Sequence, residues 1–168
     1  MTDSSILETT AEVSVAFSGF ISVFLILASR DGRFAPRDAF AIRVIVVSGI
    51  SPVFYAILPL LLHSLGVSEP TVWRASSVLM AFFSVLIFAV VMLPKWRAVN
   101  KEEQVPTMEF SNLSSRVLGA VHFFCLIANV FAWPWVPSGG VYLLAVWGII
   151  AIAGTTFVSL IFKRVLDD

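Results

Sequence analysis

The sequence predicts an all-α membrane protein, a polytopic bundle of about five spanning helices whose N-terminus lies outside and whose C-terminus lies in the cytoplasm. The first observation is composition: 58% of the 168 residues are hydrophobic, only 13% are charged, and the mean hydropathy is +0.93. Soluble domains carry roughly 25% charged residues, so this chain has too few charges to cover a water-exposed surface. The second is a series of long apolar runs, and the third is an uneven distribution of Lys and Arg.

The expected spans follow from the lengths of the apolar runs, because a spanning helix needs about 20 mostly apolar residues. Five runs qualify or nearly do, at about 11–29, 42–65, 75–93, 117–136 and 141–162. We find no internal repeat, low-complexity tract or second domain. All five spans therefore belong to a single transmembrane domain covering 1–168.

Glycine, proline and serine mark the connections. Gly66 is a natural C-terminal stop for the second helix, and Ser68 then caps the third helix with Pro70 in its first turn. Residues 137–140 (Pro-Ser-Gly-Gly) predict a similar tight hairpin between the fourth and fifth helices. The one long polar loop is expected at 94–115.

Orientation follows from the basic residues, which collect on the cytoplasmic side of a membrane. Five spans place ten of the eleven on one side: Arg30, Arg33, Arg37, Arg43, Lys95, Arg97, Lys101, Arg116, Lys163 and Arg164. The other side receives only Arg74. We therefore expect an N-out, C-in protein of the cell membrane, with the overall pattern of a small bacterial inner-membrane protein. An aromatic belt is expected at the outer surface, formed by Trp73, Trp133, Trp135 and Tyr142.

Several function classes are excluded by composition and by absent motifs. The formal net charge is zero, which excludes a strongly basic nucleic-acid binder. No charged residue lies in the middle third of any expected span, and the chain contains no G-x-S-x-G, H-E-x-x-H or Gly-rich phosphate loop. The sequence therefore predicts that the protein is not an enzyme.

The expected helices carry faint polar stripes. The members are Ser14, Ser18 and Ser22 on the first helix, Ser48, Pro52, Tyr55, Pro59 and His63 on the second, Ser115, His122, Asn129 and Trp133 on the fourth, and Gly148, Thr155 and Ser159 on the fifth. Such stripes can line a watery path or a polar ligand pocket. They can equally serve ordinary helix packing, because small and hydroxylated residues let membrane helices approach closely.

Two histidines raise the question of haem or metal binding. His63 lies near the outer end of its helix and His122 near the inner end of its own, which separates them by roughly 15–20 Å in depth. One haem cannot take both as axial ligands within a protomer. No Cys/His/Asp cluster supplies further metal ligands, so no cofactor and no metal is expected.

A polar cluster is expected at the outer edge of the membrane. Glu12 falls at or just inside the hydrocarbon boundary, where an ionisable group is costly unless it is paired or hydrated. Arg74 is the one basic residue on that side, with His63 and Glu69 at the same level. Glu12 and Arg74 therefore form a candidate pair, or each side chain reaches the headgroups separately.

The expected partners are the lipid bilayer and further copies of the same chain. Small-residue faces around Ser18 and Gly148 are candidates for subunit contact. The Arg-rich loop at 30–43 is a candidate site for anionic lipid. Two functions stay open: a passive pore or channel between subunits, or a non-conducting accessory or scaffold protein that binds a partner protein or lipid. A lipid-modifying enzyme is the third and weakest alternative.

Overall fold

A computed structural model describes residues 4–28, 36–93, 109–131 and 138–167, and no strand occurs within these ranges. The helices are α1 (Ser4–Ala28), α2 (Pro36–Ser64), α3 (Glu69–Ile87), α5 (Glu109–Phe131) and α6 (Gly139–Asp167). A short π-helix, η2 (Phe88–Met92), continues α3. Five helical segments of the described chain are long and apolar enough to cross a membrane, which confirms the predicted all-α spanning bundle.

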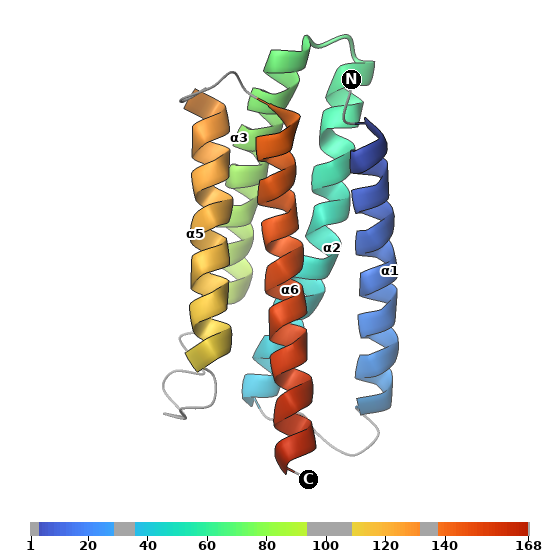
Figure 1. Ribbon diagram of the computed structural model, residues 1–168, viewed down its shortest axis with the longest axis vertical. Coiled ribbons are helices and arrows are strands. Elements are labelled where there is room, and N and C mark those ends of the chain that lie inside the picture. Colours follow the sequence, from blue (N-terminus) through green and yellow to red (C-terminus); the bar gives the residue numbers. More distant parts are fainter. Residues whose placement is uncertain (1–3, 29–35, 94–108, 132–137, 168) are drawn as a thin grey trace.

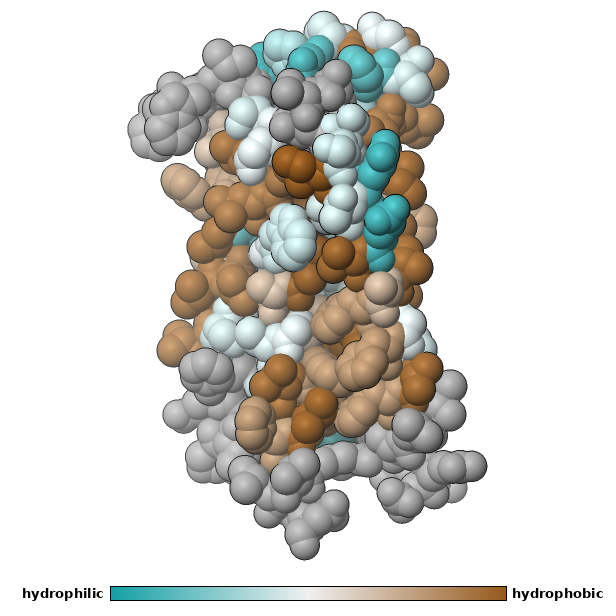
Figure 2. All heavy atoms as spheres, turned by 45° about the vertical axis from the view of Figure 1, so that its right-hand side comes forward, coloured by the Kyte–Doolittle hydropathy of each residue, from teal (hydrophilic) through white to brown (hydrophobic). Residues whose placement is uncertain are grey.

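The outer surface of the bundle is apolar around its middle. Each of the five segments presents a phenylalanine that is more than half exposed: Phe20, Phe54, Phe82, Phe124 and Phe162. Figure 2 shows hydrophobic side chains spread over most of one face between the two ends. Soluble monomers rarely expose apolar surface on this scale. The chain is therefore a multi-pass membrane protein whose apolar surface contacts the lipid bilayer.

The helices alternate in direction along the chain (Figure 1). The beginning of α1, the α2–α3 turn, the end of α5 and the beginning of α6 lie at one end of the bundle, and the end of α6 lies at the other. Helix α6 is central and packs mainly on α2 and α5, whereas α1 packs mainly on α2 at the edge. We call the end that holds the α2–α3 turn the turn end, and the opposite one the far end.

Two separate clusters of buried side chains hold the bundle together. The first lies toward the turn end and joins all five helices, with Tyr55, Trp73, Leu126 and Tyr142 among its members. The second lies toward the far end and comes from α1, α2 and α6 only: Ile21, Ala41, Ile45, Phe157 and Leu160. Helices α3 and α5 therefore contribute no buried side chain to the second cluster.

The turn between α2 and α3 lies where it was predicted, but the Ser68 side chain does not cap α3, because its hydroxyl bonds to the Thr71 hydroxyl at 2.9 Å and not to a backbone N–H. Gly66 has a φ of 82°, a left-handed conformation that glycine adopts without steric cost. Ser68 precedes α3 in an extended conformation, and Pro70 stands in the first turn of that helix. The two helices are consequently antiparallel neighbours.

Several details differ from the prediction. Helix α1 begins at Ser4 rather than near residue 11, and α5 begins at Glu109, so part of the expected 94–115 loop is helical. Hydropathy marks only the part of a helix that faces lipid, whereas backbone hydrogen bonds continue into its polar ends. Trp73 and Tyr142 are buried and pack on each other, with ring centroids 5.8 Å apart, instead of joining an outer belt. Trp133 and Trp135 lie outside the described residues.

Candidate functional site

A cavity of about 630 Å³ lies between α2, α3 with η2, α5 and α6, and we call it the inter-helix cavity. Helix α2 lines it with one face, whose residues recur every three or four positions: Phe40, Ala41, Val44, Val47, Ser48, Ser51 and Tyr55. The other helices contribute Ser84, Ile87, Phe88, Met92, Ser115, Arg116, Gly119, His122, Phe123, Ile149, Ile152 and Thr156. Most of this wall is apolar, as is usual for a small-molecule site.

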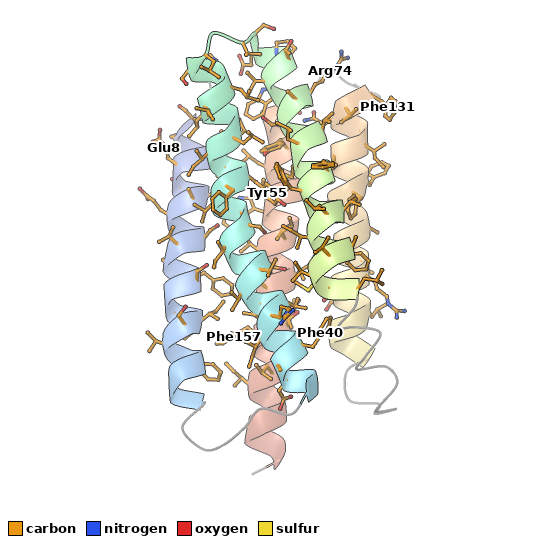
Figure 3. The ribbon with its side chains drawn as sticks, turned by 180° about the vertical axis from the view of Figure 1, so that it is seen from behind. Glu8, Phe40, Tyr55, Arg74, Phe131 and Phe157 are labelled. Atoms are coloured by element: carbon orange, nitrogen blue, oxygen red, sulfur yellow. The ribbon has the colours of Figure 1, made fainter. Side chains whose placement is uncertain are left out.

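The cavity exists because α3 with η2, and α5, do not pack against α2 toward the far end. The buried cluster there unites α2 with α1 and α6, and it contains no residue of α3, η2 or α5. Gly119 leaves further space, since a Cβ built on it meets no heavy atom within 4 Å. Figure 3 shows Phe40 nearer the far end and Tyr55 higher on the same helix, so the cavity extends from the far end toward the middle of the bundle.

A chain of hydrogen bonds lines the part of the cavity nearest the middle of the bundle, which we call its inner end. Nδ1 of His122 lies 3.0 Å from the Ala145 carbonyl oxygen, which can only accept, so this nitrogen carries the proton. In a neutral imidazole Nε2 is then an acceptor, and the Ser84 hydroxyl donates to it over 3.2 Å. That leaves the Ser84 oxygen to accept from the Tyr55 hydroxyl at 3.3 Å. Every donor of the Tyr55–Ser84–His122 chain is therefore in use.

Tyr142 anchors this chain to the rest of the bundle. Its hydroxyl donates to the backbone carbonyl of Tyr55 over 2.7 Å, and its side chain is fully buried. A proline inside a helix has no N–H to donate to the carbonyl oxygen four residues before it. In α2, Pro59 stands four residues after Tyr55, so the Tyr55 carbonyl oxygen lacks its usual helical hydrogen bond. The Tyr142 hydroxyl thus takes the place of the amide that Pro59 lacks.

Four other polar side chains of the cavity have no protein partner. Within the described ranges, no hydrogen bond or ion pair is formed by Ser48, Ser51, Ser115 or Arg116. They lie on α2 and α5, nearer the far end than the Tyr55–Ser84–His122 chain. Their unused hydrogen-bonding capacity is available to a ligand or to water.

Asn129 belongs to a second polar cluster, away from the cavity. Its amide donates to the Ser77 hydroxyl over 2.8 Å and lies 3.5 Å from the Trp73 carbonyl oxygen. Its oxygen accepts the backbone N–H of Ser138 at 2.8 Å. These bonds tie α5 to α3 and to the start of α6, so packing accounts fully for Asn129.

The serine stripe of α1 also serves packing. Ser14 is fully buried and Ser22 is exposed, and their hydroxyls donate to carbonyls of their own helix. Ser18 faces Gly49 of α2, where a Cβ added to the glycine would stand 3.2 Å from the serine hydroxyl oxygen. The close approach of α1 and α2 is therefore built on this small-residue contact.

The stripe of α6 is used within the protomer as well. A Cβ on Gly148 would lie 3.7 Å from the Leu118 carbonyl oxygen and 3.8 Å from the Cβ of His122, both on α5. Thr155 and Ser159 are partly buried and donate to carbonyls of α6 itself. Both faces that the sequence favoured for subunit contact, around Ser18 and Gly148, thus pack inside one chain.

The structure does not bring the expected outer-edge cluster together. Glu12, His63, Glu69 and Arg74 are all exposed, and no ion pair joins them within the described ranges. Glu12 stands on α1, which packs mainly on α2, whereas Arg74 stands on α3. Figure 3 places Glu8, one turn before Glu12, on the opposite side of the bundle from Arg74.

The two histidines have different surroundings: His63 is exposed at the end of α2, whereas His122 is buried in the bundle. The described part of the chain holds no group of three His, Cys, Asp or Glu residues that could bind a metal ion. The Arg-rich loop cannot be placed, since its central residues lie outside the described ranges.

Sequence reasoning found Tyr55, Ser48, Ser115 and His122 but missed other residues of the cavity. Ser84 was missed because the sequence analysis singled out no polar residue on the third helix. Its spacing of seven residues from Ser77 places both on one helical face and could have revealed it. Arg116 was used only as one of the basic residues that predict the orientation of the chain in the membrane.

No protein family, curated protein or solved structure matches this chain.

Proposed function

We propose that this membrane protein is a non-enzymatic binding protein that holds an amphipathic, lipid-like molecule in the inter-helix cavity. The observation that carries the proposal is the cavity itself, about 630 Å³ in volume and lined by four helices. Small-molecule sites occupy roughly 300–1,000 Å³ and combine apolar walls with a few convergent polar groups. This cavity has both, and in a bilayer its natural occupants are molecules that already partition into lipid.

The proposal corresponds to an accessory protein that binds lipid rather than to a pore. A pore between subunits needs polar or small-residue faces that are free to meet in an oligomer. The faces around Ser18 and Gly148 pack within the protomer instead. The Tyr55–Ser84–His122 chain also uses its own donors at the inner end of the cavity, so it offers none to a passing ion's hydration shell. These contacts favour a bound molecule over a path for ions, and no oligomer is needed to form the site.

The test is to fill the cavity without disturbing the helices. Gly119→Leu points a side chain into the cavity, whereas Gly19→Leu on α1 points one outward from an exposed position. Neither added Cβ meets a heavy atom within 4 Å, and both glycines are inside helices, so the pair is matched. Each protein is purified in mild detergent and its bound amphiphiles are extracted and quantified by mass spectrometry.

We expect the wild type and Gly19→Leu to carry the same amphiphile at similar occupancy, and Gly119→Leu to carry about tenfold less. A folded wild-type protein with no bound amphiphile would contradict the proposal. So would a Gly119→Leu protein that retains the molecule at wild-type occupancy.

A further inference from the structure

We infer that the ligand of the inter-helix cavity is an amphiphile with an oxyanion head, a carboxylate or a phosphate, bound by Arg116 and the hydroxyls of Ser48, Ser51 and Ser115. This inference rests on the proposed function and specifies the chemical class of the bound molecule.

Charge is the first argument. Arg116 is the one charged residue among the described residues that line the cavity, and no carboxylate of the described ranges pairs with it. Arg116 is exposed where it lines the cavity, and its guanidinium can form charge-assisted hydrogen bonds with an anion. An anionic head compensates this charge, whereas a cationic head would be repelled.

The unpartnered hydroxyls are the second argument. Ser48 lies seven residues before Tyr55 on α2, and Arg116 lies six residues before His122 on α5. At 1.5 Å per residue these separations are about 10 Å and 9 Å along the two helices. Since Tyr55 and His122 are linked through Ser84 and the two helices run in the same direction (Figure 1), Ser48 and Arg116 stand at about the same depth. Hydroxyl donors and a guanidinium at one level suit the several oxygens of an oxyanion.

The apolar wall continues on both sides of this polar level. Its lining on α2 extends from Phe40 to Tyr55, about 22 Å at the usual helical rise, and Ser48 lies about 10 Å from Tyr55. The apolar part of the ligand therefore has wall to contact both toward the middle of the bundle and toward the far end.

The inner end of the cavity accepts an apolar chain despite its polar side chains. The donors of Tyr55, Ser84 and His122 are already bonded to one another or to the Ala145 carbonyl. A hydrocarbon chain placed against them leaves no donor unpaired, so it carries no desolvation penalty for a lost hydrogen bond. Arg116 and the three serine hydroxyls are therefore the groups of the cavity that still need a hydrogen-bonding partner from the ligand.

The experiment measures head-group preference by native mass spectrometry of delipidated protein titrated with palmitate, palmitoyl-lysophosphatidylglycerol and zwitterionic palmitoyl-lysophosphatidylcholine. The wild type should bind both anionic amphiphiles about tenfold more tightly than the zwitterionic one. Arg116→Gln should lose this preference and still bind lysophosphatidylcholine. Arg43→Gln, an exposed arginine of α2 that does not line the cavity, is the matched control and should keep the preference.

Further ligands and variants distinguish a wrong head-group assignment from a wrong choice of binding site. Inorganic phosphate, which has the anion but no chain, should compete poorly, and strong competition by it would show a free-anion site instead. An Arg116→Gln protein that keeps the anionic preference would overturn the inference while the cavity proposal stands. If Gly119→Leu binds all three amphiphiles as well as the wild type, the cavity is not the site and the proposed function fails.

Discussion

His122 shows how one polar side chain can join three helices in a lipid environment. Its two ring nitrogens bond to the Ser84 hydroxyl of α3 and to a carbonyl of α6, while the residue itself is on α5. Unpaired polar groups are costly inside a membrane, so each bond contributes to stability by avoiding that cost.

Removing either partner of the Ser84–His122 bond should reveal this coupling. We expect Ser84→Ala and His122→Ala to be non-additive, with a coupling of about 0.6–1.7 kcal/mol in the free energy of unfolding in detergent. Thr155→Ala is the control partner for His122→Ala, because its hydroxyl bonds only to its own helix, and that pair should be additive. Additivity of Ser84→Ala with His122→Ala would show that the hydrogen bond contributes nothing.

Glu12 and Arg74 should behave as independent residues. They stand on α1 and α3, both exposed, with no ion pair between them. Glu12→Gln and Arg74→Gln should therefore add within about 0.5 kcal/mol in thermal unfolding. A coupling well above that value would mean that the two helices come together at this edge in a bilayer.

The sequence predicted some residues of the site but not the residues to which they bond. Tyr55 and His122 stood out because Tyr and His are conspicuous in apolar runs and fell on recognisable stripes. Ser84 did not, since one hydroxyl in a helix is equally compatible with a bond to its own backbone. Which helices face each other decides between these roles, and that information is not present in the periodicity of one helix.

At the scale of the elements, the number and type of helices were predictable and their ends were not. Apolar length alone identified all five spans, because lipid requires about 20 apolar residues per crossing. Hydropathy could not find the seven extra residues at the start of α1 or the π-helix at Phe88–Met92, since backbone hydrogen bonding sets both. The π-helix contributes Phe88 and Met92 to the cavity wall, and such segments are frequent at functional sites.

The pairing of α1 with α2 depends on Gly49. Gly49→Leu would place a side chain against Ser18 and push the helices apart, so we expect a loss of about 1–3 kcal/mol in the free energy of unfolding. Gly154→Leu is the control, because its Cβ meets no heavy atom within 4 Å, and it should change stability by less than about 0.5 kcal/mol. Equal stability of the two variants would place α1 elsewhere.

For the whole molecule, the strongest expectation is its orientation. Ten of the eleven Lys and Arg residues belong to the far end of the bundle or to the segments that connect there, and Arg74 belongs to the turn end. We predict that the far end faces the cytoplasm. A reporter fused after Asp168 should then be cytoplasmic, and one placed before Asp3 should be external. The opposite result at both termini would invert the molecule and place Arg116 in the outer leaflet.

The cavity is the central claim at this scale, because it is what distinguishes the molecule from a solid bundle of membrane helices. The most direct measurement is a cryo-electron microscopy structure of the full chain in lipid nanodiscs, with a bound antibody fragment to supply mass. We predict elongated non-protein density between α2 and α5, beside Arg116 and Gly119 and ending at Tyr55. A map in which α3 and α5 close against α2 along their whole length, leaving no space beside Gly119, would contradict the account.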